Sequence, residues 1–203
     1  MRIIGGKDGG RIIRMPDGVR IRPTQDRVRE AMFNVIRESV PGSRVLDLYA
    51  GSGAFGIEAL SRGADSATFV DDDNKCISAI KSNLRVLDAR RQECAQVLKK
   101  DALRAISHFK DGNKKFDVIF LDPPYCKDPL DKLGTIRHTL GPIESLAKNA
   151  LIKIGAYDIL FQRGFAIAEH FIKDEIPVHA GGLKLFKEKQ YGDTVLSFYR
   201  KNQ

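Results

Sequence analysis

Apolar residues recur along the chain with two periods, and segments of the two kinds alternate after a break at Pro41-Gly42. Short runs with strand character lie at 45–48, 67–70, 95–99, 116–121 and 157–161. Segments with helical spacing lie at 55–61, 75–87, 102–109 and somewhere within 130–149. This alternation predicts an α/β fold in which helices cover both faces of a mostly parallel sheet.

The two ends of the chain depart from this alternation. Strand patterns at 183–190 and 194–200 flank a Tyr-Gly-Asp turn and predict an antiparallel hairpin that closes the sheet. Residues 1–22 predict a small β-hairpin, because glycine pairs and a Pro-Asp-Gly turn separate short apolar segments. A helix should then begin with Thr24 as its N-cap. We therefore expect an N-terminal extension at 1–40 and a main domain at 41–203, with no assignment for 163–182.

Positive charge is concentrated in the extension. The 203-residue chain has a net charge of +8, and residues 1–22 hold six cations against two acids. Five of the six cations are arginine, whose planar guanidinium suits phosphate. Contact with a nucleic acid is therefore expected, with Arg11, Arg14 and Arg20 among the contacting residues.

Other features of the composition exclude some classes of protein. The three cysteines and four histidines are scattered, so no disulfide framework and no metal site is predicted. The sequence shows no signal-like apolar segment at its start and no apolar run of membrane-spanning length. We expect a cytoplasmic protein without a membrane partner.

A glycine-rich loop follows the first strand of the alternating region. Within "VLDLYAGSGAFG" at 45–56, the glycines are Gly51, Gly53 and Gly56, and Asp71 comes twenty positions after Gly51. This spacing is typical of a dinucleotide-binding loop, in which glycines form the tight turn and the acid binds ribose hydroxyls.

The acid Asp47 indicates a different cofactor from NAD. At ~5–6 Å and an effective dielectric of about 20, a carboxylate and a phosphate charge repel by roughly 3 kcal/mol. The same carboxylate attracts the ammonium and sulfonium of S-adenosylmethionine, although it could instead only pair with the loop backbone. The predicted cofactor-binding residues are Asp47, Ala50, Gly51, Gly53, Asp71, Asp72 and Asp101. Asp101 is equally suited to be a helix N-cap.

The sequence "FLDPPY" ends the fourth strand with Asp122, Pro123, Pro124 and Tyr125. The prolines stop the strand and stiffen the chain after it. In a doubly wound sheet this segment lies beside the first strand, at the ligand crevice. A carboxylate and a proline carbonyl can accept hydrogen bonds from an exocyclic amine, and a tyrosine ring can stack on a base for ~1–3 kcal/mol. These four residues are therefore the predicted catalytic site for methylation of a base amine that is held in near-attack geometry.

Five segments together resemble the RsmD family, whose members are class I S-adenosylmethionine-dependent methyltransferases that act on guanine N2 of small-subunit ribosomal RNA. They are "MRIIGGKDGGRII", "IRPTQDRVREAMFN", "LDLYAGSGAFGIEALSRGA", "DVIFLDPPY" and "KEKQYGDTVLSFYRK". The resemblance implies a Rossmann-like fold with a seven-stranded sheet and a basic hairpin that helps to hold ribosomal RNA or a small-subunit assembly particle. It also implies that Arg22, Thr24 and Arg27 lie near the mouth of the active site.

Two positions and one segment differ from the family pattern. Asp71 stands where glutamate is more usual, and the expected fifth strand ends at Gln162, where relatives often have glutamate. Residues 126–135 also differ, which leaves access to the target open. The modified guanine, the choice between free RNA and an assembled particle, and the oligomeric state are not determined by the sequence.

Three other functions use parts of the same sequence pattern. Adenine-N6 methylation of DNA needs the same amine site, although no second domain for reading DNA is evident. An NAD-linked oxidoreductase would use the glycine loop, and a non-enzymatic RNA-binding module would use only the basic extension. Product mapping, cofactor binding and the effect of Asp122→Ala distinguish these alternatives.

Overall fold

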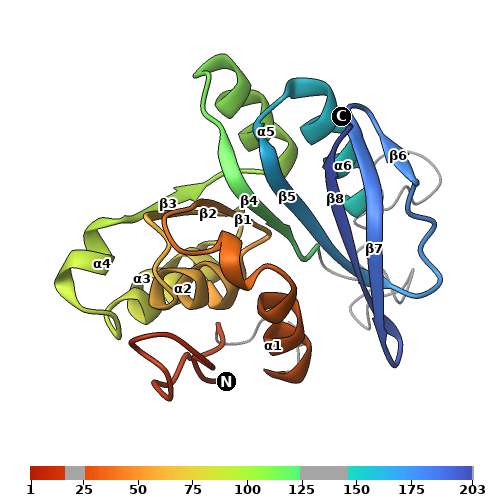
Figure 1. Cartoon of the computed structure of the whole chain (residues 1–203). Helices are drawn as coiled ribbons and strands as arrows, with labels where there is room; N and C mark the ends of the chain where they lie inside the picture. Colours follow the sequence, from red (N-terminus) through yellow and green to blue (C-terminus); the bar gives the residue numbers. More distant parts are fainter. Residues whose placement is uncertain (17–25, 124–145, 203) are drawn as a thin grey trace, which may run out of the picture.

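An eight-stranded sheet forms the centre of the protein, with strand order β3-β2-β1-β4-β5-β8-β7-β6 (Figure 1). The computed structural model describes residues 1–16, 26–123 and 146–202. The strands are β1 Arg44–Leu48, β2 Ser66–Asp71, β3 Ala95–Lys99, β4 Phe116–Leu121, β5 Leu160–Phe171, β6 His179–Ala180, β7 Leu183–Tyr191 and β8 Thr194–Lys201. The helices are α1 Asp26–Val35, α2 Ala54–Ser61, α3 Asn74–Leu84, α4 Ala89–Glu93, α5 Ala102–Asp111, α6 Leu146–Tyr157 and the 3₁₀ helix η1 Arg37–Ser39.

The strand pairing confirms the predicted α/β architecture. Strands β3, β2, β1, β4 and β5 pair in parallel, and β8 runs antiparallel to both β5 and β7. The C-terminal hairpin of β7 and β8 therefore extends the sheet as expected. The short strand β6, which pairs with the start of β7, adds an eighth strand to the seven that the family resemblance implies.

The fifth strand is present, but its predicted bounds of 157–161 are wrong. Residue 157 ends α6, and β5 continues from Leu160 to Phe171, through residues that matched no pattern. Its pairing with β4 jumps from Leu160 to Phe165, and a Cβ on Gly164 would lie 2.7 Å from the Asp117 carbonyl oxygen. A polar, glycine-containing irregularity thus interrupts the apolar pattern and hides the continuation of the strand. Of the helix expected within 130–149, only residues 146–149 belong to the described chain, and they are helical.

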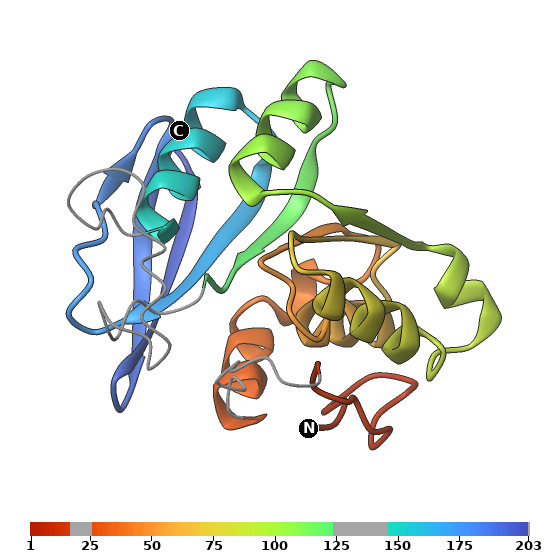
Figure 2. The same cartoon turned by 180° about the vertical axis from the view of Figure 1, so that it is seen from behind.

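Two apolar layers cover the sheet, one on each face (Figures 1 and 2). Successive residues of β4 alternate between them, because Val118 and Phe120 pack with α1, α2 and α3 while Ile119 and Leu121 pack with α5 and α6. Strand β1 has β2 on one side and β4 on the other. The carboxyl ends of β1 and β4 therefore meet at the point where the winding of the sheet reverses, which is where such folds bind ligands. None of the described helices is long and apolar enough to cross a membrane.

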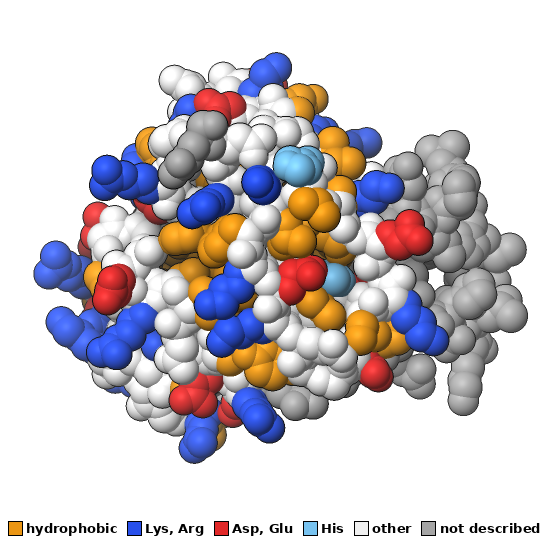
Figure 3. Space-filling view, turned by 45° about the vertical axis from the view of Figure 1, so that its right-hand side comes forward, with side chains coloured by type: hydrophobic (Ala, Val, Ile, Leu, Met, Phe, Trp, Pro, Cys, Tyr) orange, Lys and Arg blue, Asp and Glu red, His pale blue; other side chains and the backbone are white. Residues whose placement is uncertain are grey.

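Helix α1 covers one face of the sheet over β4. On the same face, the outer strands leave side chains exposed. Helix α1 packs over β4, where the ring centroids of Phe33 and Phe120 are 5.7 Å apart. Beyond α1, strand β7 leaves Phe186 38% exposed. Lys and Arg side chains lie among apolar side chains on the side of the molecule that contains β7 and β8 (Figure 3).

The N-terminal segment forms an antiparallel turn that is shorter than the predicted hairpin. Within residues 1–16, the pairing is a single bridge between Arg2 and Ile12, flanked by backbone hydrogen bonds from Ile3 N to Arg11 O (2.9 Å) and from Ile13 N to Met1 O (3.0 Å). The predicted N-cap Thr24 lies outside the described residues.

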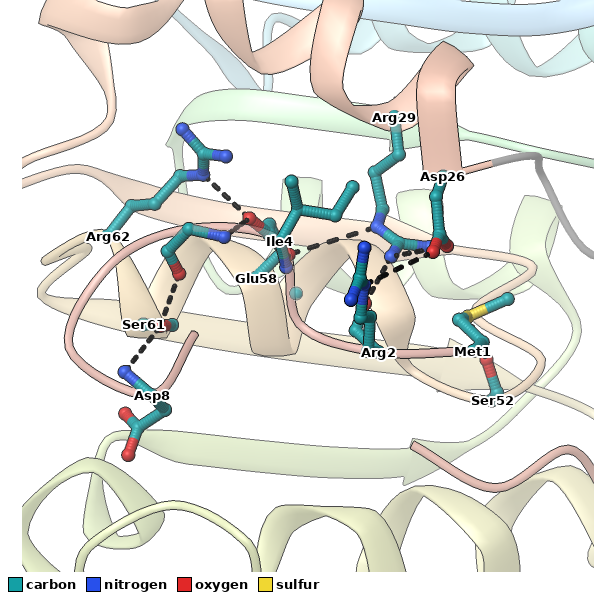
Figure 4. Close-up of polar contacts among 12 residues, drawn as sticks. Met1, Arg2, Ile4, Asp8, Asp26, Arg29, Ser52, Glu58, Ser61 and Arg62 are labelled. Atoms are coloured by element: carbon teal, nitrogen blue, oxygen red, sulfur yellow. Dashed lines mark hydrogen bonds and ion pairs between the residues drawn. The ribbon is translucent and has the colours of Figure 1, made fainter. Parts of the chain in front are cut away.

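A fully buried carboxylate holds this segment against α2. Glu58 accepts hydrogen bonds from the backbone N–H groups of Ile4 (2.7 Å) and Gly5 (2.8 Å) and from Arg62 Nε (2.8 Å), and it faces Arg29 Nε at 3.8 Å (Figure 4). Burial lowers the pKa of Arg29. The Arg29 guanidinium therefore depends on the Glu58 and Asp26 carboxylates for compensation.

The next turn of α2 adds a second attachment. The Ser61 hydroxyl accepts from Asp8 N (3.0 Å) and donates to Gly5 O (2.7 Å), and Lys7 N donates to Ser61 O (2.9 Å) (Figure 4). A Cβ on Gly6 would lie 2.0 Å from Ser61 O, so the two backbones touch here. The N-terminal segment is fixed along the surface of α2 and shares its apolar core through Ile3 and Ile13.

Glu58→Ala should lower the free energy of unfolding by about 3–5 kcal/mol, because it leaves Arg29 buried without its strongest compensating charge. It should also increase hydrogen exchange at residues 3–14. Urea denaturation and exchange mass spectrometry measure the two effects. The control Glu30→Ala changes an exposed acid of α1. Unchanged exchange at 3–14 in the Glu58 variant would show that the segment is held by other contacts.

Candidate active site

The loop between β1 and α2 has the conformation that its three glycines predict. Gly51 has φ of 55° and Gly53 has φ of 78°, both in the left-handed region that glycine occupies at little cost. A Cβ on Gly56 would lie 2.3 Å from the Phe69 ring, so the third glycine lets α2 pack closely on β2. The Ala50 N–H donates to Val70 O at 3.0 Å and ties the loop to the same strand.

Asp47 lies beneath this loop and is fully buried. Its Oδ2 accepts a hydrogen bond from Gly56 N at 3.0 Å, and its Oδ1 has no hydrogen-bond partner among the residues that the structure describes. Burial raises the pKa of Asp47 to about 8. The sequence left open whether Asp47 pairs with the loop backbone, and its Oδ2 does so. Its Oδ1 remains available as an acceptor for an ammonium group.

Asp71, at the end of β2, also binds the loop. Its Oδ2 accepts from Gly51 N at 2.9 Å and its Oδ1 from Asp73 N at 3.0 Å. Burial raises the pKa of Asp71. Its neighbour Asp72 is exposed, as expected. The two carboxylates Asp47 and Asp71 therefore hold the glycine loop from below and from the side.

Tyr49 is a candidate site residue that the sequence reasoning missed. Its φ of 58° is unusual for an aromatic residue, and such strain is often found at functional sites. Burial raises the pKa of the Tyr49 hydroxyl, and the nearby charges of Asp101 and Asp72 raise it further. Asp101 itself is the N-cap of α5, where it accepts from Arg104 N at 2.9 Å. The only sequence signal for Tyr49 is its position inside the glycine motif.

Asp122 follows β4 directly and contacts the end of β1. Its backbone N–H points to Leu48 O at 3.5 Å, and Leu48 pairs with Leu121 in the sheet. Asp122 is half-buried and Pro123 is buried. The predicted acid therefore lies at the crevice next to the glycine loop. Pro124 and Tyr125 lie outside the described residues, as does the divergent segment 126–135.

Glu169 of β5 is the second residue that the sequence reasoning missed, because the fifth strand was expected to end at Gln162. Ala168 pairs with Leu121, so Glu169 and Asp122 occupy the next position on two neighbouring parallel strands. Glu169 is 6% exposed and lies next to Met32, Phe55, Phe120, Leu121, Ile167 and Leu196. The alternating run "FAIAEH" after Gly164 was the available signal.

The predicted RNA-contacting residues are only partly within the described chain. Arg11 is exposed, its guanidinium donates to Val86 O and it pairs with Asp8 at 3.5 Å. Arg14 and Arg27 are exposed. Arg20, Arg22 and Thr24 lie outside the described residues.

Asn83 of α3 connects the N-terminal segment to the glycine loop. Its Oδ1 accepts from Arg14 N (3.0 Å), and its Nδ2 donates to Arg14 O (2.8 Å) and to Ser52 O (2.9 Å). Ser52 stands between Gly51 and Gly53. One buried amide therefore holds the backbone of the arginine-rich segment and the backbone of the loop together.

These residues fit S-adenosylmethionine, the cofactor that the sequence predicts. The unpartnered Asp47 oxygen matches an ammonium group, and the open glycine backbone gives room for the methionine part. Tyr49 lies close enough to Asp101 and Asp72 for their charges to raise the pKa of its hydroxyl. Among the described residues, no group of three or more His, Cys, Asp or Glu side chains could hold a metal ion.

Comparisons with known proteins match nearly the whole chain. The family model described as "Conserved hypothetical protein 95" matches residues 1–200. The chain is 39% identical over 201 residues to the Bacillus subtilis "Putative rRNA methyltransferase YlbH", which covers 99% of each protein. It is 31% identical over 204 residues to the Escherichia coli "Ribosomal RNA small subunit methyltransferase D", which covers 99% of this chain and 90% of that protein. The chain belongs to the RsmD family of methyltransferases.

Solved structures of similar proteins have the same architecture as this RsmD-family protein. The "Putative methyltransferase yhhF from Escherichia coli" has a TM-score of 0.75 at 27% identity and covers 99% of this chain and 97% of its own. The "putative methylase HI0767 from Haemophilus influenzae" has a TM-score of 0.74 at 30% identity and covers 100% and 99%. The predicted class I methyltransferase fold is therefore confirmed.

Asp47→Asn should reduce the pH dependence of the stability of the cofactor-free protein. Burial raises the pKa of Asp47 from 3.8 to about 8, so the folded protein keeps a proton that the unfolded chain releases above pH ~4. The contribution of Asp47 to stability is therefore present at low pH and is lost as the pH rises from about 4 to 8. The free energy of unfolding should fall more between pH 5 and 8 in the wild type than in the D47N variant.

Urea denaturation at both pH values measures this difference, and Asp65→Asn, which changes an exposed acid, is the control. Equal falls in the wild type and the D47N variant would show that Asp47 is already ionised in the folded protein.

Asn83→Ala should weaken cofactor binding several-fold, because it frees the Ser52 carbonyl and loosens the glycine loop. The loss of buried hydrogen bonds should also cost about 1–3 kcal/mol of stability. Calorimetry with S-adenosylmethionine and urea denaturation measure the two effects. Asn34→Ala, at an exposed position of α1, is the matched control. Wild-type cofactor affinity in the N83A variant would exclude a positioning role for Asn83.

Proposed function

We propose that this protein transfers a methyl group from S-adenosylmethionine to the exocyclic N2 amine of a guanine in small-subunit ribosomal RNA. The observation that carries the proposal is the position of Asp122-Pro123 at the carboxyl end of β4, against the end of β1 and its glycine loop. This is where a methyl donor and a base amine must meet in a doubly wound sheet. The names of the relatives from Bacillus subtilis and Escherichia coli support ribosomal RNA as the substrate class.

The chemistry requires a group that makes the base amine nucleophilic. The nitrogen lone pair of an exocyclic amine is delocalised into the ring, so the amine reacts slowly unless a hydrogen-bond acceptor localises that pair. Asp122 accepts a hydrogen bond from the amine and takes up its proton when the new N–C bond forms. The Pro123 carbonyl is a second acceptor without a competing N–H. The cofactor, when bound, supplies the electrophilic methyl group.

The second carboxylate favours guanine over adenine. The Watson–Crick edge of guanine presents N1–H and N2–H₂ as adjacent donors, and enzymes that flip a base read this edge. Asp122 and Glu169 occupy equivalent positions on neighbouring strands and can accept from the two donors. Adenine presents an unprotonated N1 beside its amine, and a carboxylate there would face another acceptor. Adenine-N6 methylation therefore fits this pair of acids less well.

The cofactor is held by the residues around the glycine loop. Asp47 neutralises the ammonium, directly or through water, and Ala50, Gly51 and Gly53 allow close approach of the backbone. Asp71 exchanges its bond to Gly51 N for the ribose hydroxyls. Asp72, Asp101 and Tyr49 surround the adenosine.

The substrate RNA, or an assembly particle that contains it, is held by the N-terminal part of the chain. We assign residues 1–40 to an RNA-contacting extension and 41–203 to the methyltransferase domain, with Arg11, Arg14 and Arg27 facing the RNA. A ribosomal RNA substrate implies that the enzyme acts in the cytoplasm. Pro124 and Tyr125 complete the base pocket in this proposal.

Asp122→Ala should reduce methyl transfer at least 10³-fold and leave the Kd for S-adenosylmethionine within about twofold, since the acid acts on the amine. Glu169→Gln should lower kcat/KM for RNA without changing cofactor affinity. Transfer from labelled cofactor to small-subunit RNA or particles from cells that lack the enzyme, followed by mass spectrometry of the product, measures both.

The control Asp111→Ala changes an exposed acid at the end of α5 and should leave activity unchanged. Methylated adenine in the product, or no methylated guanine with any small-subunit substrate, would overturn the proposed function. Full activity of the D122A variant would exclude the proposed catalytic residue.

A further inference from the structure

A β-bulge in β7 gives the two faces of the C-terminal hairpin different chemical characters. Leu185 pairs with Tyr199, whereas the next pair joins Lys187 to Phe198, so Phe186 is an extra residue in β7. A bulge sets two residues opposite one and shifts the alternation of faces by one position. Phe186 and Lys187 therefore lie on the same face as Phe198. This is the sheet face that α1 covers over β4.

This shift gathers cations on the open face. The register places Lys184, Lys187, Lys189 and Arg200 there, because directly paired antiparallel residues share a face. Lys184, Lys187 and Arg200 are exposed, and Lys189 is half-buried. None of the four has an ion-pair partner within the part of the chain that the structure describes. The whole hairpin, 183–202, holds five cations against two acids.

The acid of the same strand segment is turned to the opposite face. Glu188 pairs with Ser197 in the sheet, and its Oε1 accepts from the Ser197 hydroxyl at 2.8 Å. The Ser197 hydroxyl also lies 2.8 Å from His170 Nε2. Glu188 therefore has buried partners of its own and does not neutralise the cations on the other face.

An aromatic side chain lies among these cations. The Phe186 ring has the Arg200 guanidinium carbon 5.2 Å from its centroid and the Phe165 ring centroid at 5.8 Å. An exposed ring beside a planar cation is a surface on which a base can stack, as in proteins that bind single-stranded nucleic acid. Figure 3 shows the apolar and basic side chains interleaved on this side of the molecule.

The open face begins at the active-site edge of the sheet. Phe171, two residues beyond Glu169, pairs with Thr194, and Thr194 also pairs with Tyr191 at the end of β7. From there, the cations are spaced along β7, whose backbone rises about 3.4 Å per residue. The N-terminal segment lies on the other side of α1 (Figure 1).

We propose that the open face of the β7–β8 hairpin, formed by Lys184, Phe186, Lys187, Lys189 and Arg200, is a second RNA-binding surface of this enzyme. The inference rests on the proposed function, because it takes the bound polyanion to be the substrate RNA. The lysines contact phosphates, and Phe186 with Arg200 stacks on an unpaired base. Since the N-terminal segment binds on the other side, the target nucleotide is held between two contacts.

The test compares two variants that each lose two charges. The first is the double variant Lys184→Gln/Lys187→Gln, which removes two charges from the open face. The second is Lys110→Gln/Lys153→Gln, which removes two charges from α5 and α6 on the opposite face of the sheet. Binding to small-subunit ribosomal RNA, both free and in assembly particles, is measured at several salt concentrations. Two lost phosphate contacts should reduce the slope of log K against log salt by about 1.5. The α5–α6 variant should keep the wild-type slope.

A third variant, Phe186→Leu, keeps an apolar side chain over Phe198 and removes the stacking surface. It should bind RNA about tenfold more weakly with an unchanged salt slope. Calorimetry with S-adenosylmethionine should give the wild-type Kd for all variants, which shows that the fold and the cofactor site are intact.

A wild-type salt slope in the K184Q/K187Q variant would overturn the proposal. So would weaker binding of this variant to assembly particles but not to free RNA, because the face would then bind a ribosomal protein. Failure of the wild-type enzyme to methylate guanine is a separate result that overturns the proposed function. If the wild type methylates guanine and all variants bind RNA equally well, only the proposal of a second RNA-binding surface is overturned.

Discussion

The hydrogen bond from Gly56 N to the buried Asp47 carboxylate joins the end of β1 to the start of α2. Most other features of the site depend on this contact. It fixes the glycine loop between the two elements, and it positions the helix that carries Glu58 and Ser61. Those side chains in turn hold the N-terminal segment. A costly buried acid therefore lies where β1, the glycine loop and α2 meet.

Side-chain contacts connect the glycine loop to the N-terminal segment. Asn83 bonds to both, and the Ser52 hydroxyl points to Met1 Sδ at 3.9 Å. Arg14 and Ser52 are therefore joined through one side chain.

Periodicity and turn chemistry predicted most of the fold, while long-range contacts decided what was missed. Strands β3 and β4 have the predicted bounds. The continuation of β5 beyond residue 161 was missed because an irregularity around Gly164 breaks its pattern, and Glu169 was missed with it. The glycine loop and Asp122 were predicted from local motifs. Asn83 and Glu58 carry no local signal, since their partners lie 69 and 53 residues away in the chain.

In a strand of this length, the bulge at Phe186 decides which face each charged side chain of β7 occupies. Strict alternation would put Lys187 and Lys189 on the face of Leu185 and would bring Glu188 beside Phe186. The bulge absorbs this residue, so Leu185 and Lys187 pair with consecutive residues of β8, Tyr199 and Phe198. The loss of the bulge residue would therefore leave Lys187 and Glu188 on the faces that they occupy now.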